Sequence, residues 1–139
     1  MAKLRHIALY ADDAIAAAHF YRDAFDMEIV RENANACSLT DGIMNVTIIR
    51  SREGFPAGIH HFGMWVDDLE AGQEKAVKAG AQFHMGPPPE GQGAFEIKYK
   101  TPDGATIFDI THTGWPGSVK DVAPAVAARE PEKPKVTVP

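Results

Sequence analysis

Two histidines, His6 and His61, stand at the same place in two similar segments of the chain. Residues 4–13 read LRHIALYADD and residues 59–68 read IHHFGMWVDD, a shift of 55 positions (from 4 to 59). Imidazole is the commonest protein ligand for metals. Two related strands that pack about a pseudo-twofold axis would bring these histidines together without closeness in the sequence.

An Asp pair ends each segment, and a helical pattern follows each pair. The pattern covers 14–25 in the first copy, which is rich in alanine, and 69–79 in the second, which Gly80 closes. Side-chain oxygens just before a helix accept hydrogen bonds from its first backbone N–H groups. We therefore interpret the four acids as helix caps, although they look like paired catalytic acids (Asp12, Asp13, Asp67, Asp68).

Short strand-like runs come after each helix. In the first half they are 28–32, 36–40 and 43–50, and in the second half they are 82–85, 95–100 and 105–111. Asp41-Gly42 and Pro102-Asp103-Gly104 are typical of the turns between the last two strands of each half. The sequence thus predicts a βαβββ unit that occurs twice.

Alternation of side chains along strands indicates which face of each strand is polar. His6, Ala8 and Tyr10 share one face of the first strand. Asn45 and Thr47 share one face of the fourth, and the opposite faces of both strands are apolar. We expect helices to cover the apolar faces and a ligand cavity to lie against the mixed faces.

The repeat predicts one domain over 1–112, with modules of approximately 1–55 and 56–112. Residues 113–139 form a tail rich in proline and alanine, which cannot bury enough apolar surface to order itself alone. Trp115 would allow the start of this tail to lie against the domain or against a partner subunit.

Composition excludes several classes of partner. The net charge of −5 and pI near 5.6 leave no basic excess for nucleic acid. No run of apolar residues approaches the length of a membrane span, and the N-terminus lacks the apolar core of a signal peptide. Cys37 stands alone, so no internal disulfide forms. We expect a cytoplasmic protein.

Four segments together resemble the vicinal-oxygen-chelate superfamily: 6–10, 20–25, 61–68 and 102–109. That superfamily includes glyoxalase I, fosfomycin-resistance thiol transferases, extradiol dioxygenases, methylmalonyl-CoA epimerase and bleomycin-binding proteins. The resemblance implies an α+β fold in which two βαβββ modules form a half-open mixed β-sheet barrel around a metal cavity.

The resemblance also implies a ligand set. His6, His61 and Asp109 would hold one divalent metal ion (Fe²⁺, Mn²⁺, Zn²⁺ or Ni²⁺), with Thr47 at the fourth, equivalent position. Relatives usually place the carboxylate four residues past the turn glycine, whereas Asp109 is five past Gly104. One extra residue turns a strand side chain to the other face, so we expect a β-bulge that returns Asp109 to the cavity.

Other side chains receive roles by the same reasoning. Asn45 and Thr47 are predicted to bind substrate. Tyr99 is predicted to be catalytic, because several relatives carry a tyrosine near the metal at this place. His60 should point to the face opposite His61 by alternation.

A site of two histidines and one acid leaves positions open for a substrate that chelates through two adjacent oxygens. The resemblance implies a metal-dependent enzyme acting on a small oxygenated metabolite, either extradiol-dioxygenase-like or a glyoxalase-type lyase. Thr47 cannot serve as the acidic ligand that glyoxalase I relatives carry there. For the dioxygenase interpretation, the histidine that those enzymes carry beside the metal ligands cannot be assigned. For a phosphonate substrate, the cavity strands lack the cluster of Arg and Lys that would bind it.

The alternative is a non-catalytic protein that binds a small molecule, as bleomycin-resistance proteins do. Pure binders of this superfamily have generally lost the metal histidines, whereas His6 and His61 are both present here. Relatives of this length usually form homodimers, and we expect one. Whether the cavity is built within one chain or across a dimer stays open.

Overall fold

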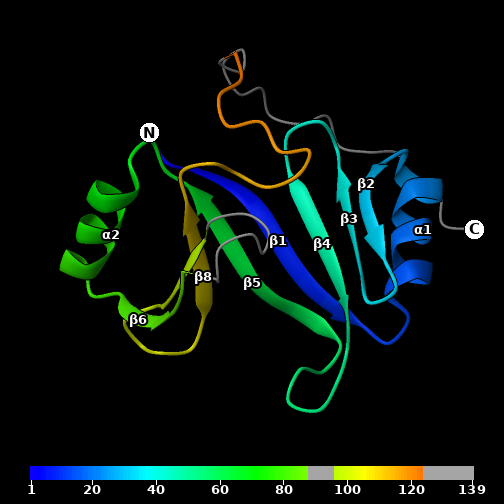
Figure 1. The fold of residues 1–139 in the computed structure, drawn as a ribbon, viewed down its shortest axis with the longest axis horizontal. Helices are drawn as coiled ribbons and strands as arrows, with labels where there is room; N and C mark the ends of the chain where they lie inside the picture. The colour runs from blue at the N-terminus through cyan, green and yellow to red at the C-terminus, as the bar shows by residue number, and fades with distance from the viewer. Residues whose placement is uncertain (88–95, 124–139) are drawn as a thin grey trace, which may run out of the picture.

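The computed structural model describes residues 1–87 and 96–123, which form two βαβββ modules (Figure 1). The first module contains β1 (Lys3–Ala11), α1 (Ala14–Phe25), β2 (Glu28–Asn33), β3 (Ala36–Thr40) and β4 (Asn45–Arg50). The second repeats this order as β5 (Gly58–Trp65), α2 (Leu69–Lys78), β6 (Gln82–Met85), β7 (Ile97–Lys100) and β8 (Ile107–Thr111). The predicted order of elements is confirmed.

The last strand of each module begins two residues later than predicted. β4 begins at Asn45 and β8 at Ile107, because aspartates in the preceding turns take backbone N–H groups that would otherwise join the sheet. Oδ1 of Asp41 accepts from two successive N–H groups, and Oδ1 of Asp103 accepts from one. The predicted start of β7 at residue 95 lies outside the described residues.

All eight strands belong to one sheet in the order β2-β3-β4-β1-β5-β8-β7-β6. β1 and β5 pair antiparallel at its centre, and each pairs in parallel with the last strand of its own module. The sheet does not close, since β2 and β6 form its two ends. The predicted α+β half-open mixed sheet is confirmed.

Each helix covers one face of its own module, as the two ends of Figure 1 show. In the first module, Ala14 and Ala18 of α1 pack with Leu39 and Ile48 from the sheet. In the second module the corresponding cluster contains Ile97, Tyr99 and Ile110, with residues of α2 against it. The apolar faces therefore point toward the helices, as predicted, and the mixed faces are left to line a cavity.

Aspartate caps begin both helices. Oδ1 of Asp13 accepts from the backbone N–H of Ala16 at 3.0 Å, and Oδ1 of Asp68 accepts from that of Ala71 at 2.8 Å. The second aspartate of each pair therefore caps its helix as predicted. The first does not: Asp12 accepts from the hydroxyl of Ser51 instead.

After β8 the chain crosses to the first module, along the orange trace in Figure 1. We call residues 113–120 the C-terminal segment. Its backbone is held by the first module, because Oγ1 of Thr40 donates to the carbonyl of Gly117 at 2.7 Å and the N–H of Val119 donates to the carbonyl of Ile43 at 2.9 Å. The start of the predicted tail thus packs against the domain, and residues 124–139 lie outside the described part.

Neither helix of the described chain is long and apolar enough to cross a membrane.

Candidate metal centre

His6 and His61 come together because β1 and β5 each carry one extra residue just before the histidine. The pairing register skips Arg5 in β1 and His60 in β5. Arg5 and His60 are equivalent in the sequence repeat, so the two irregularities obey the same pseudo-twofold relation as the strands. The resulting distance between the centroids of the two imidazole rings is 5.4 Å.

Asp109 faces the two histidines from the neighbouring strand. It lies beside Gly63 in the parallel β5–β8 pair, just as Thr47 lies beside Ala8 in the β1–β4 pair. Thr47 and Asp109 therefore occupy equivalent places, as predicted. The expected bulge is wrong, because β8 pairs with β5 and β7 without any register shift.

One donor atom from each of His6, His61 and Asp109 lies within 4.8 Å of the other two. Oδ2 of Asp109 is 2.9 Å from Nε2 of His61 and 3.7 Å from Nε2 of His6. Ligand atoms at adjacent positions of one cation are roughly 3 Å apart when the metal–ligand bonds are near 2 Å. Small movements of the rings would bring all three atoms around one ion.

Oδ2 of Asp109 is a buried oxygen without a hydrogen bond. The whole residue is 0% exposed, and among the residues that the structure describes no donor is aligned on this atom. The close contact with His61 lacks hydrogen-bond alignment. A carboxylate oxygen withdrawn from water without a partner is costly. A divalent cation would satisfy it, so the donor set fits a metal.

The protonation states of the site also fit a metal. Burial lowers the pKa of His6 to about 4, so its ring is neutral near pH 7. Burial alone would raise the pKa of Asp109, but the nearby His61 imidazole and Lys98 ammonium outweigh it and hold the pKa at about 2. A neutral imidazole and an ionised carboxylate are the forms that bind metals.

Asn45 holds His6 from the side away from the acid. Its Oδ1 lies 2.6 Å from Nδ1 of His6, and its amide nitrogen donates to the carbonyl of Pro116 at 2.8 Å, which fixes the orientation of the amide. Because an amide oxygen only accepts, Nδ1 carries the proton and Nε2 is free to bind a metal. Asn45 is 0% exposed, so the prediction that it binds substrate does not fit its position.

Thr47 lines the cavity wall beside this network. Its hydroxyl donates to Oδ1 of Asn45 at 2.9 Å and lies 3.0 Å from the hydroxyl of Ser38. The threonine thus supports the residue that orients His6. Its predicted contact with substrate stays a prediction.

His60 lies at the cavity edge, against the expectation that it faces the other way. A residue that the register skips does not follow the alternation of its strand, and this brings Nδ1 of His60 to 2.6 Å from Nδ1 of His61. One ring donates in this contact and the other accepts. Burial lowers the pKa of His60, which favours a neutral ring able to accept from His61.

Tyr99 lies on the wrong face for the catalytic role predicted for it. It is buried in the cluster beneath α2, where its ring stacks on Phe108 and its hydroxyl accepts from Nε2 of Gln73 at 2.9 Å. Its neighbour Lys98 points into the cavity instead, with Nζ 2.6 Å from Oδ1 of Asp109. The Tyr99 hydroxyl therefore lies on the face of the sheet away from the candidate metal ligands.

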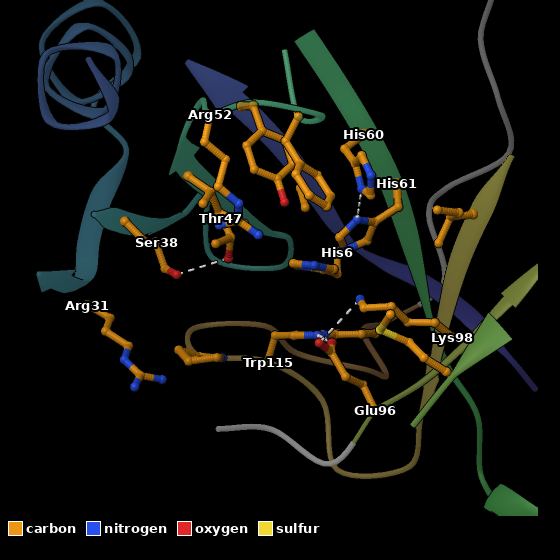
Figure 2. A pocket seen from close by; sticks show the side chains of 18 of the residues that line it. His6, Arg31, Ser38, Thr47, Arg52, His60, His61, Glu96, Lys98 and Trp115 are labelled. Carbon is orange, nitrogen blue, oxygen red and sulfur yellow. Dashed lines mark hydrogen bonds and ion pairs between the residues drawn. The ribbon is translucent and has the colours of Figure 1, made fainter. Parts of the chain in front are cut away.

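Trp115, from the C-terminal segment, forms the cover of the site. Its ring stacks on that of His6 at 4.6 Å with 10° between the planes, and its indole N–H donates to Glu96 at 2.8 Å. Burial raises the pKa of the Glu96 carboxyl, and the nearby negative charge of Asp109 raises it further. Figure 2 shows Trp115, Glu96 and Lys98 on one side of the His6 ring.

Gly63 leaves the space that this cover requires. A Cβ atom at this position would lie 2.5 Å from the Trp115 ring and 2.7 Å from Cβ of His6. Only glycine allows the strand, the histidine and the indole to approach so closely.

His6 and His61 line a cavity of about 480 Å³ that reaches from the second module to the far strands of the first. Aromatic rings from both modules line this cavity, and so do several charged side chains. Arg31, Arg52 and Lys98 all contribute to its wall, which corrects the expectation that the cavity strands lack a cluster of Arg and Lys.

The sequence did not predict that Lys98, Glu96 and Trp115 lie at the site. Lys98 and Glu96 share a strand face opposite Tyr99, and their alternation was visible, but only the register with Asp109 shows which face is inward. Trp115 lies outside the repeat, and nothing in the sequence indicates its contact with His6.

A comparison with family models matches residues 3–107 to the Glyoxalase/Bleomycin resistance protein/Dioxygenase superfamily. A comparison with curated protein sequences gave no match. Solved structures with a similar fold include the Mn(II)-bound glyoxalase from Novosphingobium aromaticivorans, with a TM-score of 0.66 and 21% identity over 88% of this chain and 44% of that one.

Homoprotocatechuate 2,3-dioxygenase from Brevibacterium fuscum gives a TM-score of 0.65 and 13% identity, over 82% of this chain and 37% of that one. Methylmalonyl-CoA epimerase from Mycobacterium tuberculosis gives 0.60 and 18%, over 77% of this chain and 85% of that one. At these identities the likeness shows the fold alone. Because the match to the family model runs from the first strand to the start of the last, the chain belongs to the glyoxalase/bleomycin resistance protein/dioxygenase superfamily.

Proposed function

We propose that this protein is a divalent-metal-dependent enzyme that acts on a small oxygenated metabolite bound through two adjacent oxygens. The observation that carries the proposal is the buried set of His6, His61 and Asp109, in which the two histidines line a cavity and one carboxylate oxygen is left without a hydrogen bond. The ion would be Fe²⁺, Mn²⁺, Zn²⁺ or Ni²⁺, and one structural relative is described as Mn(II)-bound.

When bound, such an ion supplies a Lewis acid that stabilises negative charge on a substrate oxygen. The chain's own residues prepare the place. Asn45 keeps Nε2 of His6 free of a proton. Lys98 occupies Oδ1 of Asp109, which leaves Oδ2 as the donor. Trp115 covers the His6 ring and excludes water from that side.

Two reactions remain within this proposal, ring cleavage of the extradiol type and a glyoxalase-type lyase reaction. Thr47, at the place equivalent to Asp109, offers a hydroxyl that already donates to Asn45, so it supplies no carboxylate base. This supports the ring-cleaving version. His60 and His84 also line the cavity, so imidazoles besides the ligands are present.

The test begins with the metal. Protein purified without a His-tag should contain close to one Fe, Mn, Zn or Ni per chain, and the variant H61A should contain almost none. Oxygen uptake with a panel of catechols under Fe(II), run beside a hemithioacetal assay, then separates oxygenase from lyase. Metal content that is equally low in wild type and H61A would contradict the proposal.

A metal-free binding protein is the second candidate, as expected for a relative of the antibiotic-resistance proteins. The ammonium of Lys98 favours it, because this cation pairs with Asp109 at 2.6 Å and partly neutralises the buried carboxylate. Under this candidate, small aromatic compounds bind equally well to wild type and H61A, and addition of metal changes neither affinity.

A homodimer and a cytoplasmic location stay proposals drawn from the sequence and its resemblance. Neither is needed for the site, because His6 and His61 meet within one chain.

A further inference from the structure

The end of the cavity away from the metal ligands is basic. Figure 2 labels Arg31 and Arg52 on one side of the cavity, with Ser38 and Thr47 between them, and His6 and His61 on the other side. The two arginines come from different parts of the first module. Each is placed in the cavity by a specific feature of the backbone.

A β-bulge turns Arg31 inward. Ile29 lies opposite Leu39 and packs in the core beneath α1, whereas Arg31 lies opposite Ser38, so the register skips Val30. Without that extra residue Arg31 would share a face with Ile29 and point toward the helix. The bulge reverses the alternation, and Arg31 reaches the cavity instead.

A tight hairpin and an aromatic ring hold Arg52. Arg52 and Phe55 exchange two backbone hydrogen bonds of 3.1 and 2.8 Å, and the guanidinium lies 4.5 Å from the centroid of the Phe55 ring. Phe55 in turn contacts Tyr10 and His60 on the cavity wall. The position of this guanidinium is thus fixed by packing rather than by an acid.

Neither guanidinium has an acidic partner among the residues that the structure describes. Within residues 1–87 and 96–123, Arg31 and Arg52 take part in no ion pair, while the ammonium of Lys98 is engaged by Asp109 and Glu96. Two positive charges that no acid of the described residues pairs with therefore line one cavity, although the net charge of the chain is −5. Ser38 and Thr47 add hydroxyl groups to the same wall.

We infer that Arg31 and Arg52 form a subsite for an oxyanion, a carboxylate or a phosphate, carried by the substrate at the end opposite its metal-binding oxygens. Guanidinium groups bind both oxyanions through paired, charge-assisted hydrogen bonds. The inference rests on the proposed function only in assuming that the opposite end of the substrate carries two metal-binding oxygens. The subsite itself needs no metal, so it can be tested without one.

The experiment uses metal-free protein and three probes: phenylacetate, phenyl phosphate and the neutral phenylacetamide. Binding is followed by the Nε–H NMR signals of Arg31 and Arg52. We expect saturable shifts of both signals with at least one anion, and an affinity for that anion about tenfold or more above that for the amide. Whichever anion binds more tightly identifies the group that the substrate carries.

The double variant R31Q/R52Q should lose the preference for anions, and its fold is checked by circular dichroism. R50Q is the matched control, because Arg50 is exposed at the end of β4, two residues before Arg52, and does not line the cavity. H61A should keep the preference, so loss of metal binding and loss of anion binding give different patterns. Equal affinity for anion and amide in wild type, or a preference that persists in R31Q/R52Q, would overturn the inference.

Discussion

Asn45 determines which nitrogen of His6 carries a proton, and this leads to a prediction. The variant N45A removes the acceptor for Nδ1–H, so the ring can rotate or change tautomer. We expect Zn(II) affinity to fall about 10- to 100-fold, as for other residues that orient a metal ligand. Competition with a chromophoric chelator measures it.

Asn35, which is exposed in a turn, provides the control for this substitution. N35A should bind Zn(II) like wild type. If N45A binds as tightly as N35A while remaining folded in a thermal melt, then the amide does not orient His6.

Gly63 gives a second prediction at the residue scale. In G63A the new methyl group meets the Trp115 ring and Cβ of His6, so one of them must move. Overpacking of this kind costs about 1–3 kcal/mol, and we expect both the free energy of unfolding and Zn(II) affinity to fall. Urea unfolding with and without Zn(II) measures the two effects.

The double variant G63A/W115A separates the causes. Removing the indole relieves part of the clash, so the loss in G63A/W115A should be smaller than the sum of the single losses. Strictly additive losses would show that Gly63 and Trp115 do not press on each other.

At the scale of elements, the repeat and the turn residues were enough to predict the order of strands and helices. Asp13 and Asp68 cap their helices as expected because capping is a local interaction. The bulges were not predictable, since a skipped residue such as His60 is defined only by the partner strand. Nor was the inner face of β7, because alternation shows that Lys98 and Tyr99 point in opposite directions without showing which one is inward.

The two faces of β7 can be separated by substitution. Y99F removes only the hydroxyl that accepts from Gln73. We expect the free energy of unfolding to fall by about 0.5–1.5 kcal/mol, with Zn(II) affinity unchanged. Denaturant unfolding and metal titration check this, and a Zn(II) affinity that falls tenfold in Y99F would return Tyr99 to the site.

At the scale of the whole molecule, the open strand order places the three candidate metal ligands in one chain. β1 and β5 pair within the chain, and Asp109 joins them from β8. The length and motifs of the sequence left open whether two chains share the cavity. Two modules of one chain and two modules from different chains can be related by the same pseudo-twofold axis. The position of the C-terminal segment could not be predicted either, because its contacts with Thr40 and Ile43 connect residues far apart in the sequence.

Mixing two inactive chains tests the single-chain site. H6A and H61A, unfolded together and refolded as a mixture, should bind no more metal than either alone, because each site needs both histidines from the same chain. Metal analysis of the mixture gives the answer. Recovery of metal in about a quarter of the sites would instead mean that two chains exchange their modules, as random pairing of exchanged dimers requires.

Because the Trp115 indole stacks on His6, its fluorescence should report metal binding at this histidine. The chain has two tryptophans, and the other, Trp65, donates its indole N–H to the carbonyl of His112. In W65F the remaining fluorophore would be in face-to-face contact with a ligand ring. Binding of Ni(II) or Co(II) should then quench the Trp115 fluorescence in proportion to the fraction of sites occupied. The binding of these ions can therefore be followed in real time without any added dye.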